Sequence, residues 1–194
     1  PFTDINSVQK YYNSIKFNHN NYITAGEKEG KKYKDFSLGN SPLSYNQEKI
    51  KNKTILLKTS NGTKVLNKLN DNNKIYIGAL VNCKSLINRL VTYKDNVYLV
   101  CAGRNGTFSL EDFFTAGRFC YLLKQRGYSG DDLTIAAARI YKDNSDYEDI
   151  IKLFFHSDNG QNLLRLGYKK DIKYAAQKDI FSEIPYLKNH KIII

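Results

Sequence analysis

Short apolar runs alternate along this chain with segments of helical spacing, and this alternation limits the possible folds more than any other feature. The apolar runs are TILLKT (54–59), IYIGAL (75–80) and VYLVCA (97–102). Apolar residues at helical spacing follow in 63–69, 83–91 and 109–125. Strands that alternate with helices favour a mainly parallel sheet covered by helices, so we predict an α/β fold.

The longest helical pattern, 109–125, also shows which side of its helix is buried. Its apolar face is formed by Leu110, Phe113, Phe114, Gly117 and Tyr121. The C-terminal third is more helical, with one helix predicted behind two aspartates at 131–132 and another ending at Gly167, since glycine commonly follows a helix end. We expect the 109–125 face in the core.

The length and the net charge of the chain indicate one domain that attracts anions. With 194 residues the chain can bury a substantial core, and we predict a single domain over 1–194. Lys+Arg 30 against Asp+Glu 19 gives a formal charge of +11, which attracts phosphate groups, nucleic acid or an acidic membrane surface. Because the lysines are spread along the chain without an arginine cluster or an RNA-binding signature, we predict no nucleic-acid partner.

The numbers and positions of the cysteines and histidines indicate the cellular compartment and the kinds of metal site to expect. Cys83, Cys101 and Cys120 are odd in number and two lie in apolar runs, so we expect a reducing, cytoplasmic location. No run approaches the length of a membrane span, so we predict no membrane partner, and the scattered histidines argue against a zinc site. The chain lacks methionine and opens on PFTDINSV, which reads as a strand end before a helix capped by Thr3 or Asp4; we expect a missing upstream segment.

The stretch LLKTSNGTKVLNKL (56–69) predicts a strand, a polar turn and a helix. Backbone N–H groups at such a helix start favour an anion, Gly62 allows close approach of the backbone, and Ser60 and Thr63 add hydroxyl donors. The alternative is an ordinary strand-to-helix turn with a helix cap. Both interpretations stay open from these residues alone.

A second arrangement of this kind lies at 97–119. Ser109 and Asp112 fit the spacing of a capping box, in which the carboxylate bonds back to the chain, and metal ligation by Asp112 is equally compatible. Glu111 is not needed for the cap. A pair of carboxylates at the carboxyl end of a parallel strand suits Mg²⁺, which binds one or two carboxylates and retains waters.

A third polar turn follows the short run YITAG. Glu27 and Lys28 come directly after this predicted strand, although such a pair is usually solvated. Asn40 and Ser41 lie in the turn-rich segment 32–53, where with Gly39 and Pro42 they predict a fixed turn, and long irregular segments of this kind are often functional. Since ligands of open α/β sheets bind outside the carboxyl ends of the strands, the three turns are predicted to converge on one crevice.

These stretches resemble the 2-phosphosulfolactate phosphatases, also called ComB-like proteins. The resemblance rests on the motifs GNSP, NGT and CAG…FSLED together with AGEKEG, IGALVNCKSL and LLRLGYKKDIKYAAQKDI, in the family's order over about residues 1 to 187. It implies a three-layer α/β/α fold with a mixed, largely parallel sheet. It also implies Mg²⁺-dependent hydrolysis of 2-phospho-3-sulfolactate to sulfolactate and phosphate, a step in coenzyme M biosynthesis.

The resemblance assigns roles to individual positions. The family pattern falls on Glu27, Asn40, Ser41, Asn61, Gly62, Thr63, Asn82, Gly103, Gly106, Ser109, Glu111, Asp112, Gly117 and Asp179. We predict Glu27, Lys28 and Asp112 as catalytic and Glu27, Glu111 and Asp112 as metal ligands. The predicted substrate-binding residues are Asn40, Ser41, Asn61, Gly62, Thr63, Asn82, Gly103 and Ser109.

The chain departs from the family pattern in four places. Lys28 replaces an arginine, which exchanges a bidentate fork for a point charge. Asn159 stands where histidine is expected and Ala175 where cysteine is common. The family also has a strand–helix segment before residue 1, with an Asp-x-Leu-Arg-Ala-Thr motif that would supply ligands.

Three hypotheses follow, and they belong to different classes. The first is a Mg²⁺-dependent phosphatase for a small anionic hydroxy-acid phosphate, acting through metal polarisation and a positioned water. The second is a catalytically weak relative that binds a small organic anion, and the third is nucleic-acid association through the charge of +11. The sequence leaves a homo-oligomer open.

Overall fold

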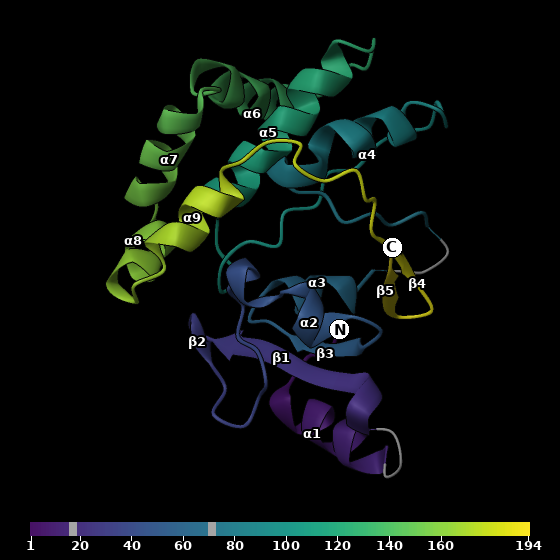
Figure 1. The fold of residues 1–194 in the computed structure, drawn as a ribbon. Helices are drawn as coiled ribbons and strands as arrows, with labels where there is room; N and C mark the ends of the chain where they lie inside the picture. The colour runs from purple at the N-terminus through teal and green to yellow at the C-terminus, as the bar shows by residue number, and fades with distance from the viewer. Residues whose placement is uncertain (16–18, 70–72) are drawn as a thin grey trace.

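The computed structural model describes residues 1–15, 19–69 and 73–194, and these divide between a small sheet region and a larger group of helices (Figure 1). The sheet region contains α1 (Ile5–Ser14), β1 (Tyr22–Lys28), β2 (Lys31–Lys32), α2 (Gln47–Ile50), β3 (Thr54–Lys58) and α3 (Gly62–Leu66). The helical group contains α4 (Cys83–Leu90), α5 (Leu110–Lys124), α6 (Asp132–Asp143), α7 (Tyr147–His156), α8 (Asp158–Arg165) and α9 (Lys169–Ala175). A hairpin of β4 (Tyr186–Lys188) and β5 (Lys191–Ile193) follows.

The sheet has the order β2-β1-β3, with β1 parallel to β3 and antiparallel to β2. β1 is buried on both faces from Ile23 to Glu27, which explains its nearly continuous apolar run. Gly26 lies opposite Lys58, and a Cβ at Gly26 would come within 2.1 Å of the Lys58 carbonyl oxygen. Glycine is therefore required where β1 and β3 approach each other.

Separate clusters of side chains pack on the two faces of the sheet. Val8 of α1 packs with Phe36 and Leu56 in one cluster, while Ala25 and Leu38 belong to another that includes half-buried side chains near α2. Asp4 caps α1 by accepting a hydrogen bond from the Ser7 N–H at 2.8 Å, so the second of the two predicted caps is the one used.

The helical group is held by an apolar core between α5, α6, α7 and α9. Phe114 is fully buried there and packs against Tyr141 and Phe154. A Cβ at Gly117 would lie 2.2 Å from the Ala137 carbonyl oxygen, so the small residue allows α5 and α6 to pack closely. The predicted core face of α5 is confirmed at these positions, and the glycine predicted to end a helix, Gly167, follows α8 with φ +83°.

Two of the four predicted strands are wrong. In 75–80 only Tyr76 forms an isolated bridge, with Tyr186, and 97–102 is extended chain outside any sheet. Val97 and Leu99 pack against the α4–α5 core, whereas Tyr98 is 83% exposed. The physical reason is that an apolar run becomes a strand only when a neighbouring strand takes up its backbone hydrogen bonds.

The α/β class is confirmed as a small mixed sheet with a parallel pair, combined with helices. The three-layer arrangement over the whole chain stays a prediction, as does the single domain. Within the described ranges, no helix combines the length and apolarity needed to cross a membrane.

Candidate functional site

Glu27 lies at the end of β1 and binds the turn that follows β3. Its Oε1 accepts a hydrogen bond from the Ser60 N–H at 2.6 Å, and its Oε2 accepts from the Ser60 hydroxyl at 3.1 Å and the Gly30 N–H at 2.9 Å. The side chain is buried, with 6% exposed. Because three donors converge on one buried carboxylate, Glu27 fixes the turn after β3 against the turn after β1.

The turn after β3 is closed by two threonines. The Thr63 hydroxyl donates to the Thr59 carbonyl at 3.0 Å, and the Thr63 N–H donates to the Thr59 hydroxyl at 3.2 Å. Thr63 is fully buried, so its side chain holds the turn. Gly62 begins α3, and among the described residues a Cβ there would meet the Thr59 hydroxyl alone, at 3.5 Å.

Asn61 joins this turn to the turn at 103–107. Its Oδ1 accepts a hydrogen bond from the Asn105 N–H at 3.0 Å. The second turn is tight, since Arg104 and Thr107 exchange backbone hydrogen bonds, and a Cβ at Gly103 (φ +67°) would lie 2.5 Å from the Thr107 carbonyl oxygen. Two polar turns that are distant in the sequence thus meet through one asparagine.

Asp112 stands behind the second turn, at the start of α5. Its Oδ2 accepts a hydrogen bond from the Gly103 N–H at 2.9 Å, while its own N–H donates to the Ser109 hydroxyl at 3.3 Å. Ser109 is therefore the N-cap of α5, as the capping-box spacing predicts. The carboxylate differs from that motif, because it bonds back to Gly103 rather than to the capping residue.

Glu111 is held by two hydroxyl groups beside a shallow depression of about 230 Å³. Its Oε2 accepts from Ser109 at 3.2 Å and its Oε1 accepts from Ser157 at 2.6 Å. Ser157 is buried and also caps α8. Arg104 and His156 line the same depression, so charged groups of both signs face it.

The other predicted residues lie at the sheet or in the chain leading to α4. Asn40 is exposed and Ser41 half-buried, and both follow Leu38, which pairs in parallel with Ala25, so the chain leaves toward the same end as β1. Lys28 is exposed at that end.

Asn82 has a structural role in this arrangement. It accepts from the Ala79 N–H at 2.9 Å and donates to the carbonyls of Ile77 (3.1 Å) and Glu183 (3.3 Å). The buried Asn82 amide thus forms these hydrogen bonds with backbone groups, and none of them belongs to the polar turns.

Two residues near the site have no role in the sequence prediction. Lys58, at the end of β3, is 8% exposed, and its Nζ donates to the Glu27 carbonyl at 3.4 Å and lies 5.4 Å from the centre of the Tyr33 ring. A lysine that closes an apolar strand before a polar turn is a signal that could have identified it. Ser157 has no such signal, since nothing near it in the sequence points to Glu111.

Asp112 fits a role as a single carboxylate ligand for Mg²⁺. Only its Oδ2 accepts a hydrogen bond in the described part of the chain, which leaves Oδ1 available, and Mg²⁺ can be held by one or two carboxylates with waters and a substrate phosphate. Glu27 and Glu111 already accept three and two hydrogen bonds. Among residues 1–15, 19–69 and 73–194, no three His, Cys, Asp or Glu side chains form a metal-binding group.

Comparison with known proteins gives a consistent result over nearly the whole chain. A sequence model of the family described as 2-phosphosulpholactate phosphatase matches residues 1–190. A probable 2-phosphosulfolactate phosphatase from Clostridium beijerinckii is 33% identical over 197 residues, covering 99% of this chain and 79% of the relative. Proteins of the same description from Thermotoga petrophila and Thermotoga maritima are 36% and 38% identical, covering 96% and 89% of this chain and 80% and 73% of the relatives.

Proposed function

We propose that this chain, which belongs to the 2-phosphosulpholactate phosphatase family, hydrolyses a small phosphate monoester where its polar turns meet, with 2-phosphosulfolactate as the substrate. The observation that supports this most directly is the hydrogen bond between Asn61 and Asn105, because it brings the turn after β3 next to the turn before α5. The names of the relatives supply the substrate class.

In the proposed arrangement, the phosphate group binds at the Asn61 turn. The buried Lys58 supplies a positive charge at the end of β3, and the overall charge of +11 attracts an anionic substrate. Arg104, which follows Gly103 in the second turn, is placed to contact a further anionic group of the substrate. The roles of Asn40 and Ser41 in substrate binding stay predictions.

The Asp112 carboxylate is the proposed Mg²⁺ ligand, through Oδ1. Bound Mg²⁺ would polarise a phosphoryl oxygen and stabilise the charge that develops during hydrolysis. The hydrogen bond from the Gly103 N–H orients the Asp112 carboxylate, and the Ser157 and Ser109 hydroxyls orient Glu111 beside it. Glu27 holds the Ser60 turn in place. Direct metal ligation by Glu27 and Glu111, and a catalytic role for Lys28, stay predictions, as do the cytoplasmic location and the link to coenzyme M biosynthesis.

The test is phosphate release from 2-phosphosulfolactate, with Mg²⁺ and with a chelator, by the chain and by Asn61→Ala and Asp112→Asn. Each substitution should lower kcat/KM by about 100-fold or more, the usual cost of losing one group that stabilises transition-state charge. Asp149→Asn, which removes a carboxylate of α7 that pairs with Lys152 and has no role in the proposed site, is the matched control and should leave the rate unchanged. Full activity in Asn61→Ala and Asp112→Asn would refute the proposed site. Sulfolactate binding without any phosphate release would favour the anion-binding relative instead.

A further inference from the structure

A second depression, of about 250 Å³, lies between α4 and α5 and is rich in positive charge. The polar side chains that line it are Lys84, Asn88, Arg118, Gln125, Arg126 and Asp179. It is distinct from the depression beside Glu111, because the two share no lining residue and its first residue on α5, Arg118, lies six positions along the helix from Asp112, or about 9 Å at 1.5 Å per residue.

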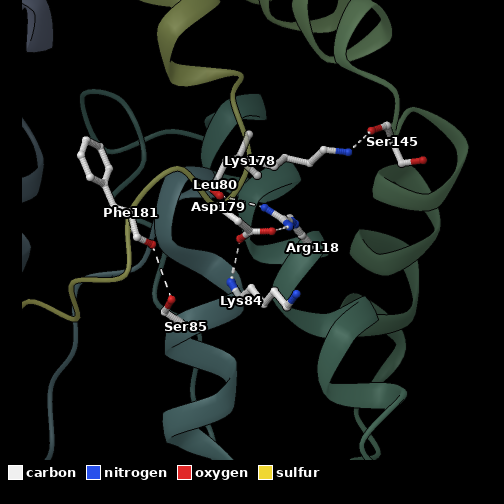
Figure 2. A network of polar contacts seen from close by, with 8 residues as sticks. All are labelled: Leu80, Lys84, Ser85, Arg118, Ser145, Lys178, Asp179 and Phe181. Carbon is white, nitrogen blue, oxygen red and sulfur yellow. Dashed lines mark hydrogen bonds and ion pairs between the residues drawn. The ribbon is translucent and has the colours of Figure 1, made fainter.

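Arg118 is buried and lines this depression, and Figure 2 shows its polar contacts. It is 5% exposed, donates to the Leu80 carbonyl at 2.8 Å and pairs with one oxygen of Asp179. The other Asp179 oxygen accepts from the Lys84 N–H at 2.8 Å. In the described chain the Arg118 Nε is buried without a hydrogen-bond partner, so Arg118 acts on the depression through its positive charge rather than through this donor.

The charges around the depression do not balance. Lys84, Arg118 and Arg126 are cationic, whereas Asp179 is the one carboxylate among the described lining residues, and both of its oxygens are already hydrogen-bonded. Arg126 donates to the Asn88 amide oxygen at 3.2 Å, which holds the guanidinium at the rim. A net positive depression with amide and guanidinium donors attracts an oxyanion.

We propose that this depression binds a small oxyanion of the class of inorganic phosphate. Its volume is below the roughly 300 Å³ at which pockets for larger organic ligands begin, so a compact ion fits its size. Arg126 and Lys84 reach the ion from the rim, and Arg118 supplies charge from the buried wall. A bound oxyanion would join α4 to α5 beside the 178–181 segment, which already contacts both helices through Asp179 and Phe181 (Figure 2).

The test is a titration of the ¹⁵N-labelled chain with inorganic phosphate, followed by NMR at constant ionic strength. Saturable shifts should appear at the amides of 84–88 and 122–126. Arg126→Gln should weaken this binding about tenfold, the effect of about 1.4 kcal/mol expected when one charge-assisted hydrogen bond is lost. Arg139→Gln, which removes an exposed arginine of α6, is the matched control and should bind as the unaltered chain does.

The variant Asp112→Asn separates the two sites. If the proposal is correct, Asp112→Asn retains the phosphate-induced shifts at 84–88 and 122–126, whatever happens at the polar turns. The proposal is overturned if the shifts at these amides do not saturate by about 10 mM phosphate. A dissociation constant of about 10 mM corresponds to a binding free energy of about 3 kcal/mol. Equal weakening in Arg126→Gln and Arg139→Gln would overturn it as well, because that result describes general charge attraction.

Discussion

Replacement of Glu27 by glutamine measures how strongly the site is held together. The carboxylate accepts hydrogen bonds from the Ser60 N–H, the Ser60 hydroxyl and the Gly30 N–H, at 2.6, 3.1 and 2.9 Å. Glutamine has nearly the same shape but offers one acceptor oxygen, so its amide nitrogen must face at least one of these donors. Losing a hydrogen bond to a charged group costs about 1.5–3 kcal/mol, and leaving a buried donor unsatisfied costs about 1–3 kcal/mol. We therefore expect Glu27→Gln to lower the free energy of unfolding by about 3 kcal/mol.

The assay is urea denaturation followed by far-UV circular dichroism, because the chain contains no tryptophan for fluorescence. Glu48→Gln, in the first turn of α2 and exposed, is the control and should stay within about 0.5 kcal/mol of the unaltered chain. If Glu27→Gln also stays within about 0.5 kcal/mol, the three hydrogen bonds do not hold the turns together and the reasoning is refuted.

Two further predictions test the helical group and the cysteines. Gly117→Val should destabilise the chain by about 1–3 kcal/mol or more, because its side chain would start 2.2 Å from the Ala137 carbonyl oxygen; an unchanged melting temperature would contradict the close α5–α6 contact. Iodoacetamide near neutral pH should modify the exposed Cys101 well before Cys83, because burial raises the pKa of the Cys83 thiol to about 12. Mass spectrometry of the digested protein measures the order of modification, and modification of Cys83 first would contradict the prediction.

The elements that the sequence predicted well are those whose pattern reflects their surroundings directly. α5 packs Phe114 and Gly117 toward α6 and α7, and it packs Phe119 and Leu123 toward α4; the helical spacing of Phe114 and Gly117 predicted the first of these faces. β1 is buried on both faces from Ile23 to Glu27, and its first five residues, YITAG, therefore carry no charge. Residues 97–102 have a similar composition, but Val97 and Leu99 pack against helices while Tyr98 faces solvent. The composition of such a segment indicates that it is extended and partly buried. It does not indicate whether another strand lies beside it.

The same distinction explains what could be predicted of the site. Polar turns were predictable because each follows a strand or an extended apolar segment, and the structure brings the turn of Asn61 and the turn of Asn105 together. The partners within the site were not predictable, because Asn61 is 44 positions from Asn105 and Glu111 is 46 positions from Ser157. Such pairs depend on how distant turns are placed by the whole fold, whereas a capping bond such as that of Ser109 spans three residues. A local pattern can therefore locate polar groups, but only the folded chain shows which of them form hydrogen bonds with one another. Glu111, predicted from its position in the sequence to bind a metal, accepts hydrogen bonds from two serines.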